Sequence, residues 1–150
     1  MSQPPIEPHQ WTHSPAPRYR RRGVVAVIVE GNRFLTIRRS AQVTAPLKLC
    51  FPGGGIEAGE TPRVALFREM QEELGVDVLP QMELWTSTTP WGTFLYWWTA
   101  HLPTEFVLKP EPLEVAEVMW MTAEELLQRE DVLASVPQFI EANRDGLFQL

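Results

Sequence analysis

Runs of β-branched and aromatic residues predict the strands of this chain. Residues 23–30 (GVVAVIVE) and 33–38 (RFLTIR) are separated by Gly31-Asn32, a dipeptide typical of tight turns. Residues 93–100 (TFLYWWTA) are apolar on both faces and follow a shorter strand predicted over 83–88. Strands that are apolar on both faces are typical of a sheet covered on both sides.

The spacing of capping residues predicts a helix over 62–74. Thr61 is a suitable N-cap, Pro62 suits the first helical position, and Gly75 can end the helix in a left-handed conformation. Two further helices are expected, over 123–129 and 135–143. The order of strands and helices predicts an α/β fold with a mixed sheet.

The starts of the two later helices share one sequence spacing. Thr122 and Glu125 form a predicted capping box, and Ser135 and Gln138 repeat its spacing, with Gly146 beyond the second helix. Both helices are therefore expected to begin at a hydroxyl-bearing N-cap.

On a helical wheel, the helix over 62–74 has two different sides. One side is apolar and is expected to face the core; it carries Val64, Leu66, Phe67, Met70 and Leu74. The opposite side gathers three acids, and only Ala65 shares their arc; these acids are Glu69, Glu72 and Glu73.

This acidic arc is locally unfavourable. Glu69 repels Glu72 and Glu73 at helical spacing, and all three lie toward the negative end of the helix dipole. No lysine lies on that side, although Arg68 flanks it. A solvated face is the plain alternative, but local choices that oppose the fold tend to mark functional sites. Carboxylates beside a glycine-rich loop suit a hard divalent cation such as Mg²⁺.

Composition narrows the class of protein. The 150 residues carry a net charge of −6, 44% of them are hydrophobic and one is a cysteine. A single domain over 18–150 is expected, preceded by a proline-rich tail over 1–17. The charge argues against a basic nucleic-acid-binding surface, and no membrane span or secretory signal is recognisable. We expect a cytoplasmic protein.

The arginines at 18, 20, 21 and 22 are interpreted as a solvated lead-in to the first strand rather than a phosphate-binding patch.

The segment that starts in the glycine loop resembles a known motif. Gly54, Glu60 and the run from Arg68 to Val76 (REMQEELGV) match the whole Nudix box, G-x5-E-x7-R-E-U-x-E-E-x-G-U, where U is apolar. The chain is thus similar to Nudix hydrolases, which cleave a nucleoside diphosphate linked to another group. The resemblance implies an α/β/α sandwich with a mixed β-sheet and a requirement for divalent cations.

The same resemblance implies roles for individual residues. Glu69, Glu72, Glu73 and the Gly53 carbonyl look like ligands of Mg²⁺, for which Mn²⁺ could substitute. Arg68 and Glu60 are expected to pair and orient the ligand helix, and Gly54 and Gly75 to support the site. A glutamate outside the motif often serves as general base. Glu114 and Glu117, both ahead of Trp120, are the candidates, with a slight preference for Glu114.

The flanking sequences FLTIRRS and LKLCFPGG resemble the MutT-type branch, which hydrolyses nucleoside (deoxy)triphosphates, including oxidised ones, to the monophosphate and pyrophosphate. On this interpretation Arg39 contacts substrate phosphates and Phe51 lines the base pocket. A surface charge and a core ring are the alternatives for these two residues. Three aromatic side chains are candidates for stacking on a nucleobase, although tryptophans in strands more often belong to the core; they are Trp85, Trp91 and Trp97.

Other functions remain open. ADP-ribose, nucleotide sugars or dinucleoside polyphosphates are alternative substrates, and a non-catalytic nucleotide-sensing module is a third possibility. Cys50 suggests the isomerase branch of the superfamily, which uses a cysteine, but we favour the interpretation that it is a small buried apolar residue. A nucleotide-type small molecule is the expected partner, without a nucleic acid polymer or membrane. The chain is expected to be a monomer or homodimer.

Overall fold

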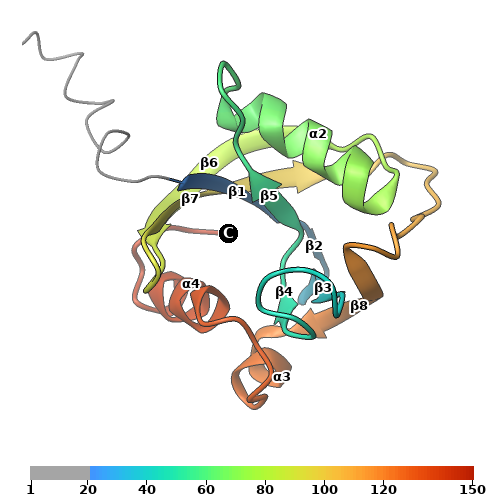
Figure 1. Ribbon diagram of the computed structural model, residues 1–150. Coiled ribbons are helices and arrows are strands. Elements are labelled where there is room, and N and C mark those ends of the chain that lie inside the picture. Colours follow the sequence, from blue (N-terminus) through green and yellow to red (C-terminus); the bar gives the residue numbers. More distant parts are fainter. Residues whose placement is uncertain (1–20) are drawn as a thin grey trace, which may run out of the picture.

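A computed structural model describes residues 21–150 (Figure 1). The predicted tail over 1–17, and Arg18 and Arg20, lie outside the described residues. One four-stranded sheet has the order β5-β1-β7-β6. Its strands are β1 (Arg21–Val27), β5 (Gly53–Gly55), β6 (Leu79–Thr88) and β7 (Thr93–His101). Because β1 and β7 are parallel and the other pairs antiparallel, this sheet is mixed, as predicted.

A second sheet is built around β3 (Arg33–Arg39). Its other strands, all antiparallel to β3, are β2 (Val29–Glu30), β4 (Leu49–Cys50) and β8 (Val115–Thr122). The single strand predicted over 23–30 is therefore divided. At Ile28 the chain leaves one sheet and enters the other, and the Ile28 carbonyl accepts a hydrogen bond from the Leu35 amide at 2.9 Å. A uniform β-branched run carries no signal for such a crossing.

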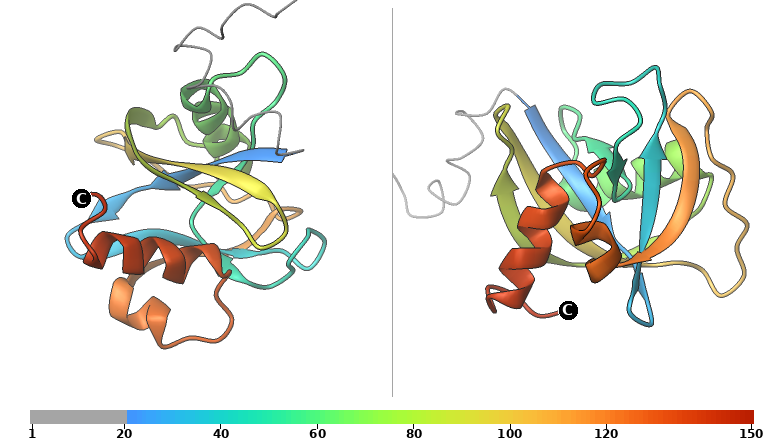
Figure 2. Two further views of the ribbon diagram at one scale, coloured as in Figure 1. Left: turned by 90° about the vertical axis from the view of Figure 1, so that its left-hand side faces the viewer. Right: turned by 90° about the horizontal axis from the view of Figure 1, so that it is seen from below.

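Helices lie on both sides of the mixed sheet. Helix α2 (Pro62–Leu74) covers one side, and α3 (Ala123–Leu127) and α4 (Ser135–Arg144) lie on the other, as the views in Figures 1 and 2 show. This confirms the predicted α/β/α sandwich with a mixed β-sheet. No helix within residues 21–150 is long and apolar enough to cross a membrane.

The predicted helix ends are mostly confirmed. Helix α2 has the predicted bounds, with Thr61 accepting a hydrogen bond from the Val64 amide and Gly75 left-handed at φ 61°. The Thr122–Glu125 capping box is present at α3. The prediction for α4 was wrong at its start: Ala134 is the N-cap, and no side chain caps the helix. Ser135 lies one position inside the helix, so its hydroxyl makes no capping bond.

An aromatic core fills the space between α4 and the two sheets. The ring of Trp97 on β7 stacks on Phe139 of α4 with centroids 4.5 Å apart. Phe51 lies between them and β3, stacked on Phe34 at 5.0 Å and edge-on to Phe139 at 5.7 Å. Burial of such rings contributes several kcal/mol of hydrophobic stabilisation, on the order of 2 kcal/mol each. The sheet is thus anchored firmly behind the glycine segment that follows Phe51.

The face of α2 that is buried differs from the prediction. Val64 and Phe67, expected in the core, are 52% and 38% exposed, whereas Ala65 and Glu73 are buried. The helix is therefore rotated so that part of its acidic arc faces the sheet. The lack of a bulky side chain at Ala65 allows this approach, which hydrophobicity on a wheel cannot anticipate. The consequence is that carboxylates, rather than aromatic rings, meet the glycine strand β5.

Candidate active site

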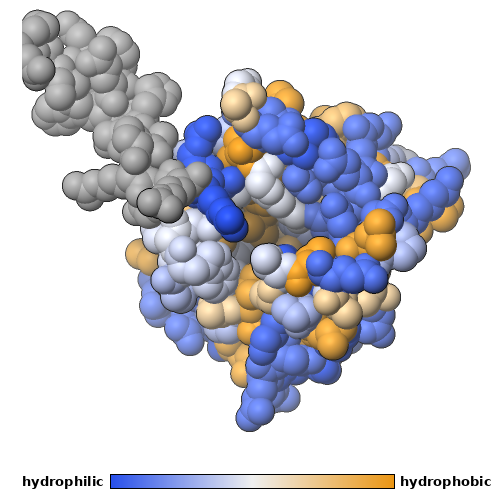
Figure 3. Space-filling view, viewed as in Figure 1, coloured by the Kyte–Doolittle hydropathy of each residue, from blue (hydrophilic) through white to orange (hydrophobic). Residues whose placement is uncertain are grey.

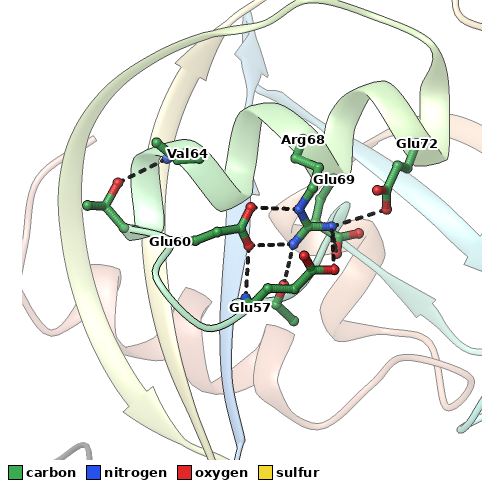
Figure 4. Close-up of polar contacts among 8 residues, drawn as sticks. Glu57, Glu60, Val64, Arg68, Glu69 and Glu72 are labelled. Atoms are coloured by element: carbon green, nitrogen blue, oxygen red, sulfur yellow. Dashed lines mark hydrogen bonds and ion pairs between the residues drawn. The ribbon is translucent and has the colours of Figure 1, made fainter.

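Arg68 is the centre of the polar contacts on the outer side of α2 (Figure 4). Its Nε and Nη2 donate to the two carboxylate oxygens of Glu60, both at 2.7 Å. Its Nη2 also donates to the Gly55 carbonyl at 2.8 Å. This two-point pairing with Arg68 lowers the pKa of Glu60 to about 2. Arg68 therefore joins the loop before α2 to the helix; that this pairing orients metal ligands stays a prediction.

The same guanidinium relieves the repulsion on the helix. Its Nη1 donates to Glu69 at 2.9 Å and to Glu72 at 3.2 Å. The carboxylates in turn raise the pKa of Arg68, so its charge is permanent. Glu72, on the solvent side, is half-exposed and faces Arg68. Arg68 thus partly compensates the negative charge of the acidic arc, on a side of the helix that carries no lysine.

Glu73 is the most deeply placed of the acids. It is buried, and its Oε1 accepts a hydrogen bond from the Gly53 amide at 3.2 Å. Burial, followed by repulsion from Glu69, raises its pKa well above the usual value. At Gly53 a Cβ would lie 2.1 Å from the Val24 carbonyl oxygen, so only glycine allows this approach. The glycine strand and the helix are joined at this point.

A cavity of about 290 Å³ opens between the glycine strand and α2. Its lining includes three acids, which are Glu69, Glu73 and Glu114. Burial raises the pKa of Glu69, and the negative charges of Glu72 and Glu114 add to that rise. These three carboxylate side chains line one cavity, here called the acidic cavity. Such an arrangement is stabilised when a cation is bound.

The structure separates the two candidates for general base. Glu114 lines the acidic cavity, and its carbonyl accepts a hydrogen bond from the Ser40 amide at 3.0 Å, which fixes its loop beside β3. Glu117 instead pairs with Arg38 at 3.1 Å and its side chain is 58% exposed. Only Glu114 is thus brought to the acidic cavity.

A second cavity of about 540 Å³ adjoins the first and is lined mainly by apolar side chains, including Phe51, Leu95 and Trp97. We call it the apolar cavity. Phe51 lines this cavity and also belongs to the buried core, so the two interpretations of this residue are compatible. Figure 3 shows the hollow between the hydrophilic surface of α2 and the more apolar region below it.

Arg39 lies where the two cavities meet. It lines both, and its Nε donates to the Thr44 carbonyl at 2.8 Å. Nη2 donates to the Thr44 hydroxyl at 3.2 Å, so the guanidinium is held by the loop after β3. Sequence reasoning missed Thr44. Within that loop Ala45 and Leu47 have positive φ values of 49° and 63°, conformations that their residue types do not signal.

The donor set fits a divalent cation. Carboxylate oxygens and a backbone carbonyl are the ligands that Mg²⁺ and Mn²⁺ prefer, and the acidic cavity offers Glu69, Glu73 and the Gly53 segment. Within residues 21–150, no three acidic, histidine or cysteine side chains are close enough together to form a ready metal site. Glu72, the third acid of the arc, is paired with Arg68 instead.

Comparison with known proteins places the site in context. The chain is 51% identical over 47 residues to the 8-oxo-dGTP diphosphatase of Escherichia coli, a match that covers 31% of this chain and 36% of the enzyme. It is 35% identical over 75 residues to an RNA pyrophosphohydrolase of Nitratiruptor, covering 47% of this chain and 48% of that protein. The matches thus span half or less of these curated relatives.

The whole fold is shared with solved structures. The MutT protein of Methanosarcina mazei superposes with a TM-score of 0.69 at 23% identity, over 84% of this chain and 94% of the other. The sequence model described as NUDIX domain matches residues 19–142, which include both cavities and the complete motif. The chain therefore belongs to the NUDIX domain family.

Proposed function

We propose that this protein is a Mg²⁺-dependent hydrolase that cleaves a nucleoside (deoxy)triphosphate, oxidised forms included, to the monophosphate and pyrophosphate. The observation that supports this most is the junction of the two cavities. An acidic cavity suited to a cation and phosphates opens beside an apolar cavity suited to a nucleoside, with Arg39 lining both. Pockets with this division of apolar walls and few polar groups are typical of ligand sites.

Glu69, Glu72, Glu73 and the Gly53 carbonyl are the residues proposed to hold Mg²⁺. The bound ion would neutralise phosphate oxygens and make a water more acidic. Arg68 and Glu60 keep the ligand helix in register with the glycine strand through their paired hydrogen bonds. Gly54 and Gly75 support the same arrangement by leaving space beside Glu69 and by ending α2.

Glu114 is the proposed general base. Its carboxylate would accept a proton from the attacking water, which adds to phosphorus as the bond to the departing phosphate breaks. Arg39 would orient the phosphates with its two remaining N–H donors, because Thr44 and the Cys50 sulfur take the other three. Glu117, paired with Arg38 outside the acidic cavity, has no part in this proposal.

Two partial relatives are named 8-oxo-dGTP diphosphatase and RNA pyrophosphohydrolase, and the first of these names, which specifies a nucleoside triphosphate, supports a triphosphate-bearing substrate. Hydrolysis of ADP-ribose, nucleotide sugars or dinucleoside polyphosphates is the alternative. The cytoplasmic location and the monomeric or homodimeric state stay predictions from the sequence.

The test is a substrate panel with and without Mg²⁺, coupled to pyrophosphatase so that released pyrophosphate is detected. We expect nucleoside triphosphates to give the highest kcat/KM, and no turnover without a divalent cation. Mass spectrometry of products formed in ¹⁸O-water identifies the phosphorus that is attacked. Turnover that survives the double change Glu72→Gln and Glu73→Gln would contradict the ligand assignment.

A further inference from the structure

Trp91 differs from the other tryptophans considered for base stacking. Trp97 is fully buried against Phe139, and Trp85 packs on Phe148 with centroids 5.7 Å apart. Trp91 is 56% exposed and lines the apolar cavity. A large aromatic side chain left exposed at the edge of a cavity is available to cover a planar ligand.

The turn that carries Trp91 is well defined. The Thr89 amide donates to the Thr93 carbonyl at 2.9 Å, and the Thr93 amide donates to the Thr89 hydroxyl at 2.9 Å. The Gly92 amide donates to the Thr89 carbonyl at 3.0 Å, with Gly92 itself in a left-handed conformation at φ 89°. Because Thr89 is buried, the hairpin is anchored at its base and holds Trp91 at the cavity edge.

Arg21 lies on the same face of the sheet. In the parallel pairing of β1 with β7, Arg21 is opposite Thr93 and Val25 is opposite Trp97. Paired residues share a face, so Arg21 is on the cavity side with Trp97. Arg21 is exposed and, among residues 21–150, has no ion-pair partner. Figure 3 shows a hydrophilic surface over the start of β1, bordering the hollow.

Arg21 lies toward the end of β1 that is remote from Glu73. Glu73 accepts a hydrogen bond from Gly53, which pairs with Val25, and Arg21 is four positions along β1 from Val25, about 13 Å at the usual rise of a strand. A nucleotide with its phosphates at the acidic cavity would therefore extend its base toward Arg21 and Trp91. The separation suits the length of a nucleoside together with the reach of an arginine side chain.

The polar groups around the apolar cavity are unevenly distributed. The described lining contains three arginines, at 21, 22 and 39, and no aspartate, glutamate, asparagine or glutamine. A carbonyl oxygen on a base would find a cationic donor there, whereas an exocyclic amino group would find no carboxylate acceptor. Guanidinium groups recognise carbonyl and ring-nitrogen acceptors of bases through paired hydrogen bonds.

We propose that Trp91 and Arg21 select the nucleobase: Trp91 stacks on its face, and Arg21 donates to a carbonyl oxygen on its edge. The enzyme then prefers bases with a keto group over those with an amino group at the same position. This rests on the proposed function for the placement of the phosphates. Both residues act by binding and take no part in bond cleavage.

The kinetic test uses substrates that differ at one position. Inosine and adenosine triphosphates form one pair, and uridine and cytidine triphosphates the other. We expect kcat/KM to be about tenfold higher for the keto member of each pair, and Arg21→Met to abolish that preference. Arg144→Met, at a surface arginine paired with Glu124, is the matched control and should keep it.

The role of Trp91 is tested by removing its ring from the protein and, separately, by removing the base from the substrate. Trp91→Ala should raise KM about tenfold for all four nucleotides with little change in kcat, and Trp91→Phe should restore most of the loss. Ribose 5-triphosphate, which has no base, should be unaffected by Trp91→Ala. Phe106→Ala, at an exposed ring outside both cavities, is the control.

Binding measurements separate this proposal from the proposed function. Calorimetry with inosine and adenosine monophosphates needs no turnover and should show the same keto preference. Equal affinities in the unmodified protein, a preference that survives Arg21→Met, or affinities that survive Trp91→Ala would each overturn the proposal. A keto preference in binding without hydrolysis of any triphosphate would overturn only the proposed function.

Discussion

The carboxyl group of Glu69 occupies the space that a side chain at Gly54 would need. A Cβ built at Gly54 would lie 2.3 Å from Glu69 Cδ, well inside contact distance. A Cβ built at the neighbouring Gly55 would have no atom within 4 Å. Gly54 therefore leaves the space that the Glu69 carboxyl group occupies, whereas Gly55 has no such steric role.

Gly54→Ala is expected to displace Glu69 and lower kcat/KM about 100-fold, since a shift of about 1 Å in a positioned group can have that effect. Gly55→Ala is the matched control and should stay within about threefold of the unmodified protein. Steady-state kinetics at saturating Mg²⁺, with circular dichroism to confirm folding, makes the comparison. Equal losses in both variants would contradict the steric explanation.

Glu114→Gln and Glu117→Gln should have very different effects. Loss of a general base lowers kcat by about 10²–10⁴-fold, so Glu114→Gln should fall in that range with KM little changed. Glu117→Gln removes only an exposed ion pair with Arg38, which is worth about 1 kcal/mol or less. A large kcat loss in Glu117→Gln and a small one in Glu114→Gln would reverse the assignment.

The sequence was sufficient for some parts of the site and insufficient for others. Local signals fixed α2 from Thr61 to Gly75, because capping depends on neighbours in the chain. The exposure of Phe67 and the burial of Glu73 could not be foreseen, because they depend on how α2 packs against the separate strand β5. The choice between Glu114 and Glu117 likewise required the pairing of β8 with β3, which turns Glu117 toward Arg38.

Pairing with Arg68 makes the contribution of Glu60 to stability dependent on pH. The pKa of Glu60 is lowered from 4.5 to about 2, so the native state favours the charged carboxylate. Its contribution is complete above about pH 5 and is lost as the pH falls toward 2. The Tm difference between the unmodified protein and Glu60→Gln should therefore be largest near neutral pH and shrink on acidification.

Thermal unfolding followed by circular dichroism from pH 3 to pH 7 measures that difference. Glu57→Gln is the control, because its carboxylate is 3.7 Å from Arg68 and largely exposed. A Tm difference for Glu60→Gln that is constant over this range would show that the pairing is not linked to protonation.

Cys50 should be unreactive in the folded protein. Burial raises the pKa of its thiol to about 11, so only about 0.1% is thiolate at pH 8. Ellman's reagent should label the native protein at least 100-fold more slowly than the protein in guanidinium chloride. Labelling at similar rates would show that the apolar cavity admits reagents to the thiol.

Within the part of the chain that the structure describes, the two cavities share only Arg39, Thr44 and the three glycines at 53–55. The hairpin with Trp91 and the start of β1 lie outside that shared set. Mutations there can change which molecules are accepted while the acids on α2 stay untouched. Proteins that descend from one ancestral gene could thus acquire new substrate specificities while the hydrolytic reaction is retained, and protein engineers have the same freedom.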